Sequence, residues 1–149
     1  MTVLPPIAGF PEADALVNVV TLYKGILYVA GNFTTIGGQA RNGLAAIDVA
    51  TRTVTAFDPL TVPGDGGSIS ALLALNDVLY IGSQNQMTFT GPVTRNYAAA
   101  VDLSGNLLPW APEPNSAVTC LSFGPNPVAG PGIHPPLVYL GGQIGRAHV

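Results

Sequence analysis

The chain consists of short apolar runs separated by turn residues, and no run shows sustained helical periodicity. Apolar runs of about four to eight residues bounded by Gly, Pro, Asn or Asp are typical of buried β-strands. The longest apolar stretch, from Ile69 to Gly82, is interrupted by Asn76-Asp77. Adjacent Asn and Asp residues favour a tight turn, so this stretch predicts two strands joined as a hairpin. The pattern as a whole predicts an all-β protein.

A repeat is visible in these runs. The segment Leu27-Tyr28-Val29-Ala30-Gly31 returns at residues 79–83 and again at residues 138–142, each time with Tyr in second place. The tyrosines are 52 and then 59 residues apart. A period of this size, built from short strands, indicates an array of sheet units such as the blades of a β-propeller.

Further landmarks extend each repeat to a unit of four strands. An apolar run precedes each Tyr segment, a run ending in Asp follows the first two, and an aromatic residue with a nearby proline closes them. Four short strands with turns between them are what a propeller blade requires. We therefore predict a β-propeller fragment with about two and three-quarters blades of four antiparallel strands. The predicted blade units are residues 16–59, residues 69–114 and the incomplete unit at residues 117–143.

The propeller domain is expected to cover residues 1–143. Residues 144–149 break the repeat and are expected to be a non-native tail. A closed propeller has about four to eight blades and an open one exposes strand edges, so the chain is expected to be part of a longer protein. The first ten residues contain no Lys or Arg and include two prolines, which does not fit a signal peptide.

Composition narrows the possible functions. Charged residues make up 9% of the chain and apolar residues 48%, with 18 Gly and 14 Pro, which fits many turns between buried strands. The five Lys and Arg residues are too few to neutralise a nucleic-acid backbone, and no apolar run is long enough for a membrane helix. We therefore expect neither nucleic-acid binding nor membrane insertion. The single Cys120 cannot form an internal disulfide and is expected to be buried in its strand.

Three pairs of polar residues recur at equivalent positions in the first two units. They are Arg41 and Arg95, Asn42 and Asn96, and Asp48 and Asp102. A structural role explains the repetition: the carboxylates accept hydrogen bonds within turns, the amides favour turns, and the guanidinium groups bond main-chain carbonyls of neighbouring loops. The alternative is a polar rim, or a ring of carboxylates, that binds cations, sugars or a protein. We treat these residues as candidate binding positions with a mainly structural role.

Equivalent aromatic residues are expected to pack within the fold. Tyr28, Tyr80 and Tyr139 hold the same strand position in successive units, and Phe57 and Trp110 hold the same place near the end of the first two. Large rings at such positions bury apolar area. An exposed Phe57 or Trp110 would instead be suited to stacking on a sugar ring.

No catalytic, metal-binding or cofactor-binding motif is recognised. His134 lies in a Pro- and Gly-rich insertion and has no second His or Cys-x-x-Cys pair to complete a zinc site. Gly37-Gly38 is not followed by a helical pattern, so it predicts a tight turn and not a phosphate-binding loop. Residues 64–67 predict a flexible loop between units, in which the lone Asp65 makes a poor calcium site.

One segment carries a family resemblance. Gly31-Asn-Phe-Thr-Thr-Ile-Gly-Gly-Gln-Ala-Arg-Asn42, followed by Leu44-Ala45-Ala46-Ile47-Asp48, resembles the delta-sixty-type β-propeller repeats, a propeller domain of unknown function in large bacterial surface and secreted proteins. The resemblance is strong over residues 16–59, weaker over residues 69–114 and partial over residues 117–143. It implies a propeller fold and an extracellular or cell-surface location, and it implies no catalytic residues.

The expected function is a non-enzymatic recognition or scaffold module of a larger secreted or cell-surface protein, since propellers present variable loops on a rigid scaffold. The expected partners are protein or carbohydrate, together with the remaining blades of the same chain. The alternative is part of a propeller-based enzyme, glycan-active or quinone-dependent, whose catalytic residues lie in other blades. A purely structural stalk is disfavoured by the divergence between residues 32–39 and residues 84–93.

Overall fold

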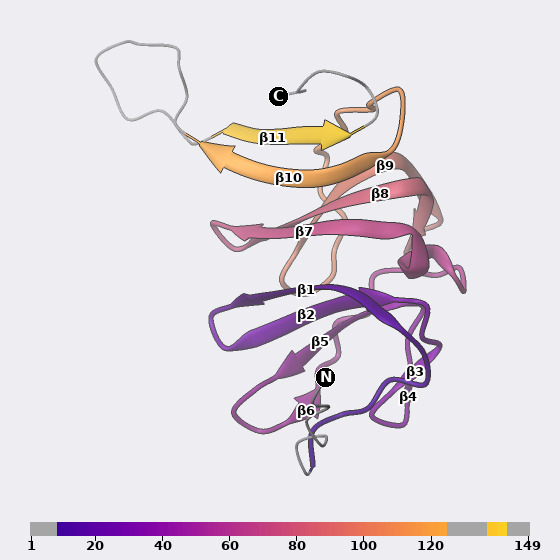
Figure 1. Ribbon diagram of the computed structural model, residues 1–149, viewed down its shortest axis with the longest axis vertical. Helices are drawn as coiled ribbons and strands as arrows, with labels where there is room; N and C mark the ends of the chain where they lie inside the picture. Colours follow the sequence, from indigo (N-terminus) through magenta and orange to yellow (C-terminus); the bar gives the residue numbers. More distant parts are fainter. Residues whose placement is uncertain (1–8, 125–136, 143–149) are drawn as a thin grey trace, which may run out of the picture.

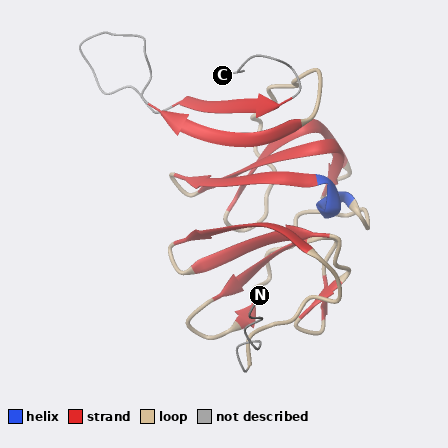
Figure 2. Ribbon diagram, viewed as in Figure 1, coloured by secondary structure: helices blue, strands red, loops and turns tan. Residues whose placement is uncertain are grey.

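The computed structural model describes residues 9–124 and 137–142, which form an all-β protein of several antiparallel sheets (Figure 1, Figure 2). The one helix among these residues is a short 3₁₀ segment, η1, at Asp65–Ser68. The all-β prediction is therefore confirmed. The predicted tail at residues 144–149 and the insertion that contains His134 lie outside the described residues.

The first repeat, which we call unit 1 (residues 16–59), forms a four-stranded sheet in the order β1-β2-β5-β6. Its strands are β1 (Val17–Tyr23), β2 (Ile26–Gly31), β5 (Leu44–Asp48) and β6 (Thr53–Val54). A separate small hairpin, β3 (Thr35–Ile36) and β4 (Gln39–Ala40), lies between β2 and β5 in the sequence. Gly37 and Gly38 form its turn with φ of 56° and 76°, a left-handed conformation that favours glycine, as the predicted tight turn requires.

The second repeat, unit 2 (residues 69–114), forms a three-stranded sheet. Its strands are β7 (Ile69–Leu75), β8 (Val78–Phe89) and β9 (Val93–Asp102). A single bridge between Val101 and Leu107 lies where unit 1 has its fourth strand. Asn76 and Asp77 join β7 to β8 with φ of 51° and 61°, so the predicted hairpin is confirmed. Unit 3 is the hairpin of β10 (Val118–Gly124) and β11 (Leu137–Gly142).

The first hairpins of the three units share one register. In each, the repeated tyrosine is paired with the same position of the preceding strand: Thr21 with Tyr28, Leu73 with Tyr80, and Ser122 with Tyr139. Each hairpin also has a β-bulge after the first residue of its first strand. The bulged residues are Asn18, Ser70 and Thr119. The repeat seen in the sequence is thus also a repeat of the backbone.

The first strands of the three units lie side by side, β1 against β7 and β7 against β10 (Figure 1). Units 1 and 2 share the main apolar core. Its large buried members are Tyr28, Leu44 and Phe57 from unit 1 and Ile69, Leu79, Ile81, Met87, Phe89 and Val101 from unit 2. Burying one side chain of this size stabilises a fold by about 1.5–3 kcal/mol, so the shared core holds unit 1 against unit 2.

The other face of unit 1 has a smaller core around Val29, Phe33 and Ile47. Phe10 and Ala13, from the segment before β1, pack against this core. The segment therefore covers part of the face of unit 1 that points away from unit 2.

Asp14 anchors this segment to the β3–β4 hairpin. Its carboxylate accepts hydrogen bonds from the main-chain N–H groups of Thr34 (2.8 Å) and Thr35 (3.1 Å) and from the Thr34 hydroxyl (2.7 Å). These bonds stabilise the charged form and lower the pKa of Asp14 to about 2, with the Thr34 hydroxyl as the largest cause.

The expectation that Cys120 is buried is wrong, because its side chain is exposed. Cys120 is paired with Gly141 on the face of unit 3 that points away from unit 2. Val118 and Leu140 occupy the opposite face and pack against Ala98 of unit 2. Successive strand residues point to opposite faces, so an apolar run is buried throughout only where both faces are covered.

The loop predicted at residues 64–67 is more ordered than expected. Residues 65–67 are part of η1, and the Asp65 carboxylate accepts a hydrogen bond from the main-chain N–H of Thr88 at 2.6 Å. The Ser68 hydroxyl donates to the carbonyl of Asp65 at 2.8 Å. Asp65 therefore fixes this connection against β8.

Candidate functional site

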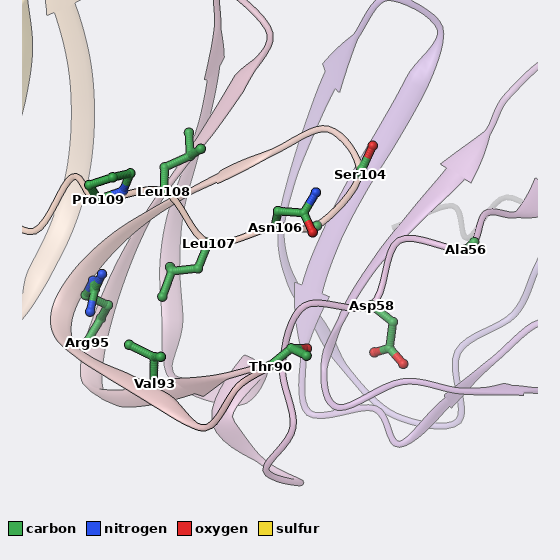
Figure 3. A pocket seen from close by; sticks show the side chains of 11 residues that line it. Ala56, Asp58, Thr90, Val93, Arg95, Ser104, Asn106, Leu107, Leu108 and Pro109 are labelled. Atoms are coloured by element: carbon green, nitrogen blue, oxygen red, sulfur yellow. The ribbon is translucent and has the colours of Figure 1, made fainter.

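A cleft of about 550 Å³ opens between the end of unit 1 and the loops of unit 2. Figure 3 shows that its side chains come from the β8–β9 turn, from β9, from the loop after β9 and from residues 56–58. The polar lining residues are Asp58, Thr90, Arg95, Ser104 and Asn106. Gly105 and the apolar side chains of Ala56, Val93, Leu107, Leu108 and Pro109 complete the lining. The cleft thus combines a carboxylate, a guanidinium, hydroxyls and an amide with apolar surface.

Arg95 is the only one of the six predicted candidate residues that lines the cleft. Its Nη1 donates to the main-chain carbonyl of Thr94 at 3.2 Å. Its Nε is buried and has no hydrogen-bond partner among the described residues. The guanidinium is therefore held by its own strand while it borders an open space (Figure 3).

Arg41, the equivalent residue of unit 1, also has a buried Nε with no hydrogen-bond partner among the described residues, but its Nη atoms make more hydrogen bonds. Its Nη1 donates to the carbonyl of Ala40 (2.7 Å), and its Nη2 donates to Gln39 Oε1 (3.0 Å) and to the carbonyl of Thr55 (2.7 Å). Thr55 follows β6, the fourth strand, which in unit 2 is reduced to one bridge. The arginine at this repeat position therefore joins neighbouring segments at the edge of unit 1, whereas in unit 2 it borders a cleft.

Asp102 positions two residues of the cleft without lining it. Its carboxylate accepts hydrogen bonds from the main-chain N–H groups of Ser104 and Asn106 and from Asn106 Nδ2, each at 2.9 Å. These bonds lower the pKa of Asp102, and the Asn106 side chain is the largest cause. Because the Asn106 amide nitrogen donates to Asp102, its Oδ1 is left as an acceptor.

Asp58 is held by its two neighbours in sequence. Phe57 is buried, and its ring meets Tyr28 edge to face with centroids 5.3 Å apart. The carbonyl of Pro59 accepts a hydrogen bond from the N–H of Thr90 at 3.1 Å. The backbone is thus fixed on both sides while the Asp58 carboxylate remains exposed at the cleft.

The repeated asparagines do not line the cleft. Asn42 Nδ2 donates to the carbonyl of Leu60 at 2.9 Å. Asn96 Nδ2 donates to Glu113 Oε2 at 3.1 Å, and Asn96 Oδ1 accepts from Gln86 Nε2 at 3.0 Å. Both residues connect separate segments of the chain.

Asp48 holds the turn after β5, where its Oδ1 accepts the N–H groups of Ala50 (3.0 Å) and Thr51 (3.2 Å). Asp48 and Asp102 each bond the turn that follows their own strand, and neither lines the cleft. This geometry is that of the predicted turn role.

The equivalent aromatic residues form the same contact in both units. Trp110 meets Tyr80 edge to face with centroids 5.1 Å apart, as Phe57 meets Tyr28. Neither Phe57 nor Trp110 lines the cleft. These contacts fit the predicted packing role, and the cleft offers no ring from this pair for a sugar to stack on.

The sequence patterns did not point to Asp58, Ser104 or Asn106 as cleft residues. The available signal was the placement of Asn106 four residues after Asp102, where its amide can bond back to the carboxylate. Comparing the two units does not reveal this signal. Asp48 is the residue equivalent to Asp102, but it bonds the main-chain N–H groups of its turn and no side-chain amide.

Over residues 9–124 and 137–142, no three His, Cys, Asp or Glu side chains lie close enough together to hold a metal ion. The same residues include no helix with the length and apolar character needed to cross a membrane.

No protein family matches the sequence, and no curated protein does. Among solved structures, the chain is similar to the computationally designed Ika4 protein, with 16% sequence identity, 91% of each chain covered and a TM-score of 0.48.

Proposed function

We propose that this chain is a non-enzymatic recognition module of the β-propeller type, in a larger secreted or cell-surface protein, and that its cleft binds carbohydrate. The observation that carries the proposal is the lining of the cleft. Asp58 and Asn106 offer acceptors, and Arg95 and Ser104 offer donors, beside apolar side chains. Sugars present hydroxyls that both donate and accept, together with apolar C–H faces, so this mixture is complementary to them.

The propeller architecture is supported by the way the units repeat. The first hairpins have one register, and their first strands lie side by side, as the innermost strands of successive propeller blades do. The resemblance of residues 31–48 to delta-sixty-type repeats supports the same architecture and the proposed extracellular setting. Propellers place their binding residues on the loops between strands, which is where this cleft lies.

The lining favours binding over hydrolysis. Glycoside hydrolysis ordinarily uses two carboxyl groups on either side of the scissile bond. Among the described lining residues, Asp58 is the one carboxylate. The competing proposal, a glycan-active or quinone-dependent propeller enzyme, depends on residues from other blades and finds no support in this cleft.

A carbohydrate array probed with the purified chain, followed by calorimetry with each sugar that binds, tests the proposal. Arg95→Gln is expected to weaken binding by about tenfold or more, because a hydrogen bond from a charged donor is lost. Lys24→Gln removes the same charge from an exposed turn away from the cleft and is expected to leave the affinity unchanged. Absence of sugar binding, or binding that a folded Arg95→Gln variant retains in full, rules the proposal out.

A further inference from the structure

The hydrogen bonds of Arg95 leave most of its guanidinium group unused. An Arg side chain carries five N–H donors, and Arg95 makes one hydrogen bond to the described residues, from Nη1 to the carbonyl of Thr94. Its Nη2 donates to none of these residues, and its Nε is buried without a partner. Arg41 instead bonds three acceptors, two of them through Nη2. Arg95 therefore borders the cleft with donors that the described part of the chain does not satisfy.

One cause is the residue two places before each arginine. In unit 1 this residue is Gln39, whose Oε1 accepts a hydrogen bond from Arg41 Nη2. In unit 2 it is Val93, whose side chain has no acceptor. Because alternate residues of a strand share a face, Val93 lies beside Arg95 on β9, and both line the cleft. Unit 2 thus has an apolar neighbour where unit 1 has one that occupies Nη2.

The second acceptor of Nη2 in unit 1 is the carbonyl of Thr55. The N–H of Thr55 bonds the carbonyl of Ala46, and the N–H of Leu108 bonds that of Ala100, which is the equivalent residue of unit 2, both at 2.8 Å. Leu108 is therefore equivalent to Thr55. Arg95 makes no hydrogen bond to the carbonyl of Leu108, and both residues line the cleft. The cleft thus lies where the arginine of unit 1 bridges to its neighbouring segment.

The charge of Arg95 is also not neutralised by the protein. Arg95 forms no ion pair with a carboxylate of residues 9–124 and 137–142. Asp58, the carboxylate that lines the cleft, lies apart from Arg95, and Figure 3 shows the two on opposite sides of Thr90. The cleft therefore has a cationic side and an anionic side that do not pair with each other.

We propose that the cleft binds acidic sugars in preference to neutral ones, with the sugar carboxylate bound by Arg95. The inference rests on the proposed function, carbohydrate binding by this cleft, and names the class of sugar. A guanidinium bonds a carboxylate more strongly than a neutral oxygen, because the hydrogen bonds are charge-assisted. Asp58 then accepts hydrogen bonds from sugar hydroxyls on the other side of the cleft. The volume of about 550 Å³ is within the range of small-molecule sites.

Calorimetry with paired sugars tests this. The probes are oligosaccharides of galacturonate, glucuronate, mannuronate and sialic acid, each with its carboxyl-reduced form, so that the members of a pair differ in the acid group alone. Each acidic sugar that binds is expected to bind about tenfold or more tightly than its reduced form, and the difference is expected to shrink as the NaCl concentration rises. The net charge of the chain is −3, so general attraction of anions does not account for such a preference.

Val93→Gln is the most direct variant, because it gives Arg95 the side-chain acceptor that Gln39 gives Arg41. It is expected to remove most of the preference for the acidic sugar, and the fold is expected to tolerate it because Val93 is exposed. Val93→Met has a similar length without the amide and is expected to lower the preference less. Arg95→Lys keeps the charge without the planar fork and is expected to retain part of the preference, whereas Arg95→Gln is expected to lose it.

Equal affinity for acidic and reduced sugars, with both weakened by Arg95→Gln, overturns this inference and leaves the proposed function standing. Absence of binding by every sugar overturns both. A folded Arg95→Gln variant that keeps the preference shows that another group binds the carboxylate, and it overturns the inference. A hexaglutamate peptide that binds as tightly as the acidic sugars shows recognition of charge alone and overturns the inference as well.

Discussion

The hydroxyl of Tyr23 donates a hydrogen bond to Asp77 Oδ1 and accepts one from the main-chain N–H of Asp77, both at 3.0 Å. These two hydrogen bonds join the end of β1 in unit 1 to the β7–β8 turn of unit 2. Lys24 Nζ lies 2.7 Å from the same carboxylate oxygen. The pKa of Asp77 is lowered, first by the hydrogen bond from Lys24 and then by that from Tyr23.

Tyr23→Phe is expected to lower the urea midpoint of unfolding, because two hydrogen bonds between units are lost while the ring is kept. Lys24→Ala is expected to have a smaller effect that disappears at high salt, since this ion pair is exposed. Tyr80→Phe is the control, because the Tyr80 ring contributes packing against Trp110. Equal midpoints for Tyr23→Phe and Tyr80→Phe would show that the Tyr23 hydroxyl does not join the units.

The two equivalent aromatic pairs differ in burial, and their truncation is expected to differ accordingly. Phe57 is 3% exposed and packs on Tyr28, which is 1% exposed, so Phe57→Ala is expected to cost about 3–5 kcal/mol of unfolding free energy. Trp110 and Tyr80 are only half-buried, so Trp110→Ala is expected to cost less. Chemical denaturation measures both, and a larger loss for Trp110→Ala contradicts the assignment of the main core.

Ser70 is expected to contribute more than an ordinary surface serine, because its hydroxyl bonds the carbonyl of Val118 across the boundary between units 2 and 3. Ser70→Ala leaves that carbonyl without its partner and is expected to cost about 1–3 kcal/mol. Ser122→Ala changes an exposed serine on the next strand and is expected to be close to neutral. The measurement is equilibrium unfolding at a protein concentration where the chain is monomeric. Equal effects of the two substitutions contradict a role for the bulge hydroxyl.

The strands and their register were predictable because their signals are local. The apolar stretch and the turn at Asn76-Asp77 that interrupts it specify β7 and β8, and the repeated tyrosines align the hairpins. The site was much less predictable. Arg41 and Arg95 are equivalent in sequence, yet Arg41 bonds the carbonyl of Thr55 and Arg95 borders a cleft.

The exposure of Cys120, which was expected to be buried, shows the same limit. Its strand has the apolar pattern of β1 and β7, but whether one face of a strand is covered depends on what packs on it. Only the arrangement of units in space shows that the Cys120 face of β10 has no unit against it among the described residues. The sequence pattern of one strand does not show whether another unit packs against it.

Acid is expected to release the segment before β1. The folded pKa of Asp14 is about 2, below its ordinary value of 3.8, so the charged carboxylate contributes stability at neutral pH. That contribution is present above pH 3.8 and is lost as pH falls toward 2, when the carboxylate is protonated in the folded state too. Asp77 and Asp102 also have lowered pKa values, so global unfolding reports all three groups and a local probe is required.

Hydrogen exchange at the Thr34 and Thr35 amides supplies that probe, since both amides donate to Asp14. After correction for the intrinsic pH dependence of exchange, their protection is expected to fall between pH 4 and pH 2. In Asp14→Asn, protection is expected to be lower already at pH 7 and to change little with acid, because no charge is left to titrate. The N–H of Thr55, which bonds Ala46 within unit 1, is the internal reference. Acid-dependent protection of Thr34 that survives in Asp14→Asn contradicts the anchoring role of Asp14.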